Sequence, residues 1–117
     1  MTTTDIQEEL DMDRQLAMFR QGDLLLVRVD RAPAGRRVEA EHGRLILARG
    51  EVTGHHHSVA VADAELVDTA EGVFLRIMAA TPLVHQEHGA ITLEPGDYRV
   101  TRQREYQPGE LPRQVAD

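Results

Sequence analysis

Short apolar runs separated by turn residues recur along this chain from position 24 onward. The first, 24–29, is rich in Leu and Val and ends at a turn containing Pro33 and Gly35. The last begins after the tight turn 94–97. The pattern predicts strands over 24–29, 45–48, 58–62, 65–67, 73–78, 82–85, 90–93 and 98–106. Short strands at such regular spacing predict an all-β domain, either a small β-barrel or a β-sandwich.

The two ends of the chain differ from this central part in their residue composition and apolar spacing. In residues 1–21, Thr4 and Gln7 are spaced to cap a helix, but the segment is acidic and its apolar spacing is irregular. A short N-terminal helix and a flexible arm therefore both remain open for this segment. We assign residues 22–106 to one β-barrel domain. The residues 107–117 contain two prolines and a glycine, and we expect a flexible C-terminal tail.

Composition narrows the classes of function. The chain of 117 residues has a formal net charge of −7, which opposes binding to a phosphate backbone and argues against a nucleic-acid partner. No apolar run approaches the roughly 20 residues of a membrane-spanning helix, and the N-terminus lacks a secretory pattern, so we expect a cytoplasmic protein without a membrane partner. The absence of cysteine excludes disulfides and thiolate metal sites.

Two histidines near position 56 are placed to act together. In the segment Gly54-His55-His56-His57-Ser58, alternation along a strand puts His55 and His57 on one face and His56 on the other. Their Cα atoms would then lie roughly 6–7 Å apart, which suits two ligands of one metal ion. His56 and the isolated His42 have no partner at this spacing, and we interpret both as polar surface residues.

A second pair follows about thirty residues later, in His85-Gln86-Glu87-His88-Gly89. Together the two segments offer His55, His57, His85 and His88 as metal ligands, with Glu87 as a further ligand or a catalytic acid or base. Imidazole and carboxylate donors suit Zn, Fe, Mn, Ni or Cu. A metal-free acid–base pair and a chance grouping are the alternatives.

Four motifs resemble those of small uncharacterised bacterial and phage proteins. They are a QGDxL start at 21–25, a GHxH at 54–57, an HxEHG at 85–89 and a QREY at 103–106. The similarity covers roughly four-fifths of the chain. It implies no function.

The same histidine segment also resembles part of the cupin pattern. His55-x-His57 after Gly50, followed by Gly89 and then Pro95-Gly96, is similar to the two cupin motifs. Cupins are double-stranded β-helix barrels that hold a metal with an HxH pair, a glutamate and a later histidine. The resemblance implies a cupin-like barrel in which His85 and His88 take the places of the missing ligands.

The last predicted strand has one polar face. Alternation places Arg102, Arg104 and Tyr106 together on it, where they would recognise an anionic substrate or a partner. The alternative is a charged edge strand that resists aggregation.

Two functions of different classes follow from these patterns. The first is a β-barrel that binds a divalent transition metal through histidines from two segments, with a structural or a catalytic ion. The second is a non-enzymatic interaction or assembly module, phage-related or forming a homo-oligomer, in which the histidines are structural. The sequence leaves open whether the protein is an enzyme.

Overall fold

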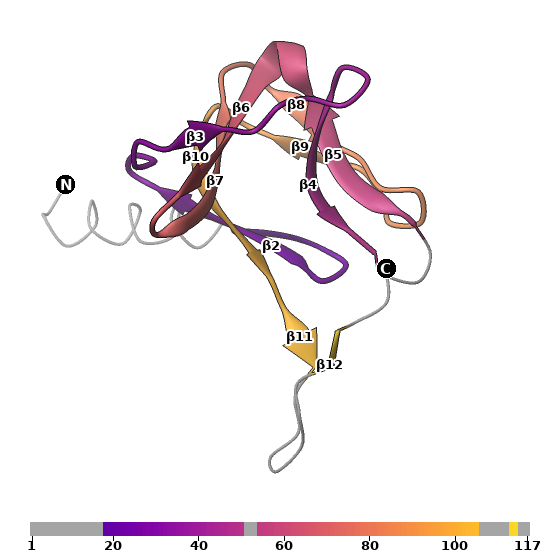
Figure 1. Ribbon diagram of the computed structural model, residues 1–117. Helices are drawn as coiled ribbons and strands as arrows, with labels where there is room; N and C mark the ends of the chain where they lie inside the picture. Colours follow the sequence, from indigo (N-terminus) through magenta and orange to yellow (C-terminus); the bar gives the residue numbers. More distant parts are fainter. Residues whose placement is uncertain (1–17, 51–53, 106–112, 115–117) are drawn as a thin grey trace, which may run out of the picture.

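The described part of the computed structural model comprises residues 18–50, 54–105 and 113–114 (Figure 1). These residues form strands and one short 3-10 turn, η1 (Val61–Asp63), and no α-helix occurs among them. The strands are β1 (Met18–Gln21), β2 (Leu24–Val29), β3 (Arg36–Arg37), β4 (Arg44–Arg49), β5 (His56–Ala60), β6 (Ala64–Thr69), β7 (Gly72–Ile77), β8 (Thr81–Leu83), β9 (Ile91–Leu93), β10 (Gly96–Arg102), β11 (Arg104–Glu105) and β12 (Arg113–Gln114). The predicted all-β class is confirmed.

One layer is a six-stranded antiparallel sheet in the order β1-β2-β10-β7-β6-β3. Its central strands alternate as their sequences predict. In β2, Leu24 and Leu26 are buried while Leu25 and Val27 are less so, which turns one face of the strand inward. The β6–β7 hairpin, predicted from the turn after Thr69, pairs in register from Ala64 with Ile77 to Thr69 with Gly72.

The second layer contains the hairpins β4–β5 and β8–β9. Two backbone hydrogen bonds join them, from Ser58 N–H to Val84 O at 3.0 Å and from Val84 N–H to Ser58 O at 2.9 Å. These bonds hold the middle of β5 beside the residue that follows β8. They therefore bring the two histidine segments next to each other.

A common hydrophobic core lies between the layers. Leu45, Val59, Leu83 and Leu93 enter it from the second layer, and residues of β2, β6, β7 and β10 enter it from the six-stranded sheet. The described strands do not close into a barrel. Of the two architectures that the sequence left open, the structure has the sandwich-like one, because two separate layers share this core (Figure 1).

Some predicted boundaries differ from the structure. β1 occupies Met18–Gln21, the last residues of the segment that we assigned to a helix or arm, and residues 1–17 lie outside the described part. The predicted strand 98–106 is interrupted at Gln103, whose N–H donates to Asp23 O at 2.8 Å. After this point the chain leaves the large sheet, and β11 pairs with β12, which falls in the predicted tail. No helix in the described ranges is long and apolar enough to cross a membrane.

Candidate functional site: a histidine cluster

The structure brings His55, His57, His85 and His88 together. His57 comes from β5, His55 directly precedes that strand, and His85 and His88 lie in the loop between β8 and β9. The ring centroids are 5.6 Å apart for His55 and His85, 4.4 Å for His57 and His85, 6.2 Å for His57 and His88, and 4.6 Å for His85 and His88. Four imidazoles from two distant segments thus form one cluster, called the histidine cluster below.

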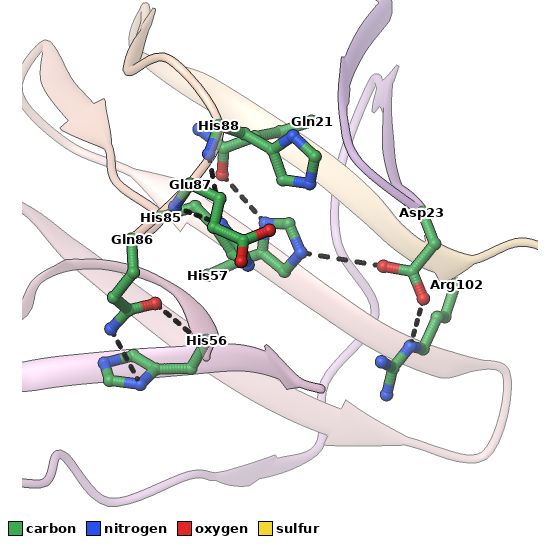
Figure 2. Close-up of polar contacts among 9 residues, drawn as sticks. All are labelled: Gln21, Asp23, His56, His57, His85, Gln86, Glu87, His88 and Arg102. Carbon is green, nitrogen blue, oxygen red and sulfur yellow. Dashed lines mark hydrogen bonds and ion pairs between the residues drawn. The ribbon is translucent and has the colours of Figure 1, made fainter. Parts of the chain in front are cut away.

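His57 is the most enclosed member of the cluster and has a defined tautomer. Its side chain is 0% exposed, and its Nδ1 lies 2.8 Å from Oε1 of Gln21 (Figure 2). The amide nitrogen of Gln21 donates to the carbonyls of Leu83 and Gly89, at 3.0 and 2.9 Å. Since these two carbonyls fix the amide orientation, Oε1 must accept, and His57 Nδ1 must carry the proton. In the neutral ring the lone pair is then on Nε2.

Asp23 faces that second nitrogen. Its Oδ1 lies 3.6 Å from His57 Nε2, and its Oδ2 accepts a hydrogen bond of 2.5 Å from Arg102 Nε (Figure 2). The Asp23 side chain is 0% exposed and that of Arg102 is 20% exposed. A buried carboxylate needs such a cationic partner, because burying an unpaired charge is costly. Arg102 therefore neutralises the buried carboxylate that lies beside His57.

Sequence reasoning missed Gln21 and Asp23 as site residues. Both flank Gly22, which has a φ of 59° and opens the two-residue loop between β1 and β2. Glycine adopts this conformation without strain, so the hairpin can direct both neighbouring side chains inward. The QGDxL motif contains all three residues, and we interpreted it only as a family resemblance.

The residues predicted to recognise an anion have a different arrangement. Arg102 pairs with Asp23 and does not present its Nε to an outside ligand. Its position on the same strand face as Tyr98 and Val100 agrees with alternation, but that face turns toward the interior of the protein. The side chains of Arg104 and Tyr106 lie outside the described part.

His56 points away from the cluster. Its N–H donates to Oε1 of Gln86 at 2.8 Å, and its Nδ1 lies 3.3 Å from Nε2 of the same amide (Figure 2). Gln86 thus ties the start of β5 to the β8–β9 loop from the outer side. The isolated His42 is exposed in the turn before β4. Neither ring belongs to the cluster.

The β8–β9 loop is organised around His85. Its Nδ1 accepts hydrogen bonds from the backbone N–H groups of Glu87 and His88, at 3.0 and 3.3 Å. Glu87 Oε1 lies 3.2 Å from His55 Nδ1, and the Glu87 side chain is 54% exposed. The glutamate therefore stands at the outer edge of the cluster, where it can exchange protons with water.

The spacing of the rings is close to what a metal ion would impose. With Zn–N bonds near 2.0 Å and tetrahedral angles, the centroids of two imidazole ligands lie about 5 Å apart. The observed separations, 4.4–6.2 Å, bracket this value. Within the described ranges, however, no three or more His, Asp or Glu side chains form a group that could hold a metal ion as it stands. Binding would require the rings to turn about their soft terminal torsions.

Comparison with known proteins places the chain in a family. The model of a domain of unknown function, DUF8820, matches residues 20–103. The chain belongs to this family. The match contains the whole histidine cluster together with Gln21, Asp23 and Arg102. No curated protein and no solved structure matches the chain. The expected membership of an uncharacterised family is confirmed, while its bacterial or phage origin, its motifs and the cupin resemblance stay predictions.

Gln21 provides a test of how the DUF8820 domain holds its two histidine segments together. We expect Gln21→Ala to lower the free energy of unfolding by about 2–4 kcal/mol, because the ring N–H of His57 and the carbonyls of Leu83 and Gly89 would each lose a hydrogen-bond partner. Chemical denaturation followed by circular dichroism measures this change.

The matched control is Gln86→Ala, which removes a second bridge between the same two segments. Its hydrogen bonds are exposed, so water replaces them and the expected change stays below about 1 kcal/mol. Equal destabilisation by the two variants would contradict the inference that Gln21 supports the cluster from within.

Proposed function

We propose that this protein binds one divalent transition-metal ion through the histidine cluster. The observation that carries the proposal is the convergence of four imidazole rings from two separate segments, at separations suited to a common ion. His57 supports the proposal further, because its Nδ1 donates a hydrogen bond to Gln21. In metal-bound histidines the nitrogen that does not bind the ion usually donates to such a partner. The donor set suits Zn, Fe, Mn, Ni or Cu.

The four histidines are not equivalent in this proposal. His57 is the central ligand, with Nε2 as its donor atom. The His55 and His88 rings lie 5.6 and 4.6 Å from the His85 ring, between centroids. His85 uses the lone pair of Nδ1 for the loop N–H groups, so it can join the ion only by giving up these bonds or the proton on its other nitrogen. His85 is therefore the proposed ligand whose hydrogen bonds must change most when the ion binds.

A position left open on the ion would allow catalysis. The ion would then lower the pKa of a bound water, and Glu87, exposed beside His55, would transfer protons at the mouth of the site. A structural ion needs no such position. The exposed carboxylate beside the cluster is what favours the catalytic version.

One observation favours a second candidate, a metal-free interaction module with structural histidines. His57 already donates to Gln21, and His85 already accepts from its own loop, so both rings have a role in holding the fold. In this version the cluster stabilises one end of the sandwich, and a second copy or another protein is the partner.

Metal titration separates these candidates. Untagged protein stripped with a chelator should take up one Zn²⁺ per chain at pH 7. Protons compete with the ion for imidazole near pH 6.5, so the affinity should fall by more than about one decade per pH unit between pH 7 and 5. Competition with a chromophoric chelator measures both the stoichiometry and the affinity.

The shape of the pH profile is the internal control. A site built mainly from carboxylates such as Glu87 would keep its affinity until about pH 4–5, because these groups titrate lower than histidine. Absence of stoichiometric uptake at pH 7 for Zn²⁺, Mn²⁺, Ni²⁺ and Cu²⁺ alike would reject metal binding and leave the module with structural histidines.

A further inference from the structure

The buried carboxylate of Asp23 lies where a ligand of the same ion would be expected. We propose that Asp23 binds the metal through Oδ1, which makes the site a mixed histidine–carboxylate centre; this inference rests on the proposed function. It adds a ligand that lies outside both histidine segments, on the loop between β1 and β2.

The distance between the donor atoms fits a shared ion. An ion about 2.0–2.1 Å from both a histidine nitrogen and a carboxylate oxygen sets these atoms about 3.3 Å apart at the tetrahedral angle. His57 Nε2 and Asp23 Oδ1 are 3.6 Å apart, which corresponds to a somewhat wider angle. Both side chains are fully buried, so the two atoms are held there by the fold.

Electrostatics also favours a cation between these two atoms. The hydrogen bond to Gln21 puts the proton of a neutral His57 on Nδ1, which leaves the Nε2 lone pair directed at a carboxylate. Two electron-rich atoms at this distance in a buried place repel each other unless a proton or a metal ion supplies positive charge between them. Arg102 neutralises Asp23 from the far side, through Oδ2.

Each of the two proposed ligands has an outer partner that fixes its orientation. Gln21 holds the far nitrogen of His57, and Arg102 holds the far oxygen of Asp23 (Figure 2). Metal ligands in proteins have this arrangement, in which a second layer of hydrogen bonds orients both histidines and carboxylates. The short β1–β2 hairpin supplies Gln21 and Asp23 together, so one loop supports both ligands.

The carboxylate has a consequence for the choice of metal. Carboxylate oxygen suits Mn²⁺, whereas imidazole alone favours Cu²⁺ strongly over Mn²⁺. A site with Asp23 as ligand should therefore lose more affinity for Mn²⁺ than for Cu²⁺ when the carboxylate is removed. A residue that only positions His57 would change both affinities by the same factor.

The experiment compares wild type with Asp23→Asn in the full chain, by titration with MnCl₂ and CuCl₂. Asparagine keeps the shape, because its oxygen can accept from Arg102 while its amide nitrogen donates to His57 Nε2. We expect Asp23→Asn to weaken Mn²⁺ binding at least tenfold more than Cu²⁺ binding. If this variant does not fold, Asp23→Asn combined with Arg102→Met removes the leftover buried charge and serves in its place.

Glu87→Gln is the matched control, since it removes the exposed carboxylate near the same cluster and should leave the Mn²⁺ to Cu²⁺ ratio unchanged. Equal weakening of both ions by Asp23→Asn, no weakening at all, or a ratio shift in Glu87→Gln instead, would overturn Asp23 as a ligand while leaving the histidine site intact. Failure of the wild type to bind either ion would reject the proposed function itself.

Discussion

Replacing His57 with alanine is expected to weaken Zn²⁺ binding by more than about 100-fold. Removing a residue that only hydrogen-bonds to a metal ligand typically lowers the metal affinity about 10–100-fold, and here a ligand itself is removed. His57 is the fully buried ring whose donor nitrogen is set by Gln21 and faces Asp23. Competitive titration against a chelator of known affinity measures the change.

His56→Ala is the control for this result. It removes the adjacent ring, which contacts Gln86 on the outer side, and should change the Zn²⁺ affinity by less than a factor of about 2. Melting of both variants in chelator shows whether they fold. Equal loss of affinity in folded His56→Ala and His57→Ala would mean that the segment binds metal as a flexible chelating loop, contrary to the defined face of β5.

Saturating Zn²⁺ is expected to raise the melting temperature by about 10 °C. The proposed ligands come from two segments far apart in sequence, as the separation of 30 between the neighbouring His56 and Gln86 illustrates, so the unfolded chain cannot present them together. An ion that binds the folded state alone adds about 2.7 kcal/mol at a hundredfold excess over Kd. For a domain of this size that energy corresponds to about 10 °C.

Thermal denaturation followed by circular dichroism, with and without Zn²⁺, measures this shift. The His57→Ala variant should show almost none of it, because its remaining ligands bind the ion weakly. A melting temperature that is the same in Zn²⁺ and in excess chelator would contradict a site that joins the two histidine segments. A shift that persists in His57→Ala would place the ion elsewhere in the protein.

Much of the fold follows from local sequence patterns. An apolar run followed by a turn predicted the strand 24–29 at its observed bounds, and turn residues predicted the β6–β7 hairpin. The period of two also separated His57, on the inner face, from His56, on the outer face. These features depend on neighbouring residues along one strand, so the sequence alone is sufficient.

The alternation of residues along the chain could not predict the interruption of the last strand. Residues 98–106 alternate between the two faces as a single strand would. The large sheet nevertheless ends where the Gln103 N–H donates to Asp23 O, and β11 then pairs with β12. Strand length in a sheet depends on the length of the neighbouring strand, because each backbone group must have a partner. The choice between barrel and sandwich likewise depended on which strands meet.

The sequence by itself determined the all-β class, most strands of the central part and the opposite faces of His56 and His57. The tertiary structure alone decided that the two segments meet, through the bonds between Ser58 and Val84. It also decided that Gln21 and Asp23 face His57 and that Arg102 pairs with Asp23. Periodicity indicates which face of a strand is buried, but it does not indicate which residues that face contacts. A buried polar group must find its partner wherever the fold supplies one, and here that partner lies on distant strands.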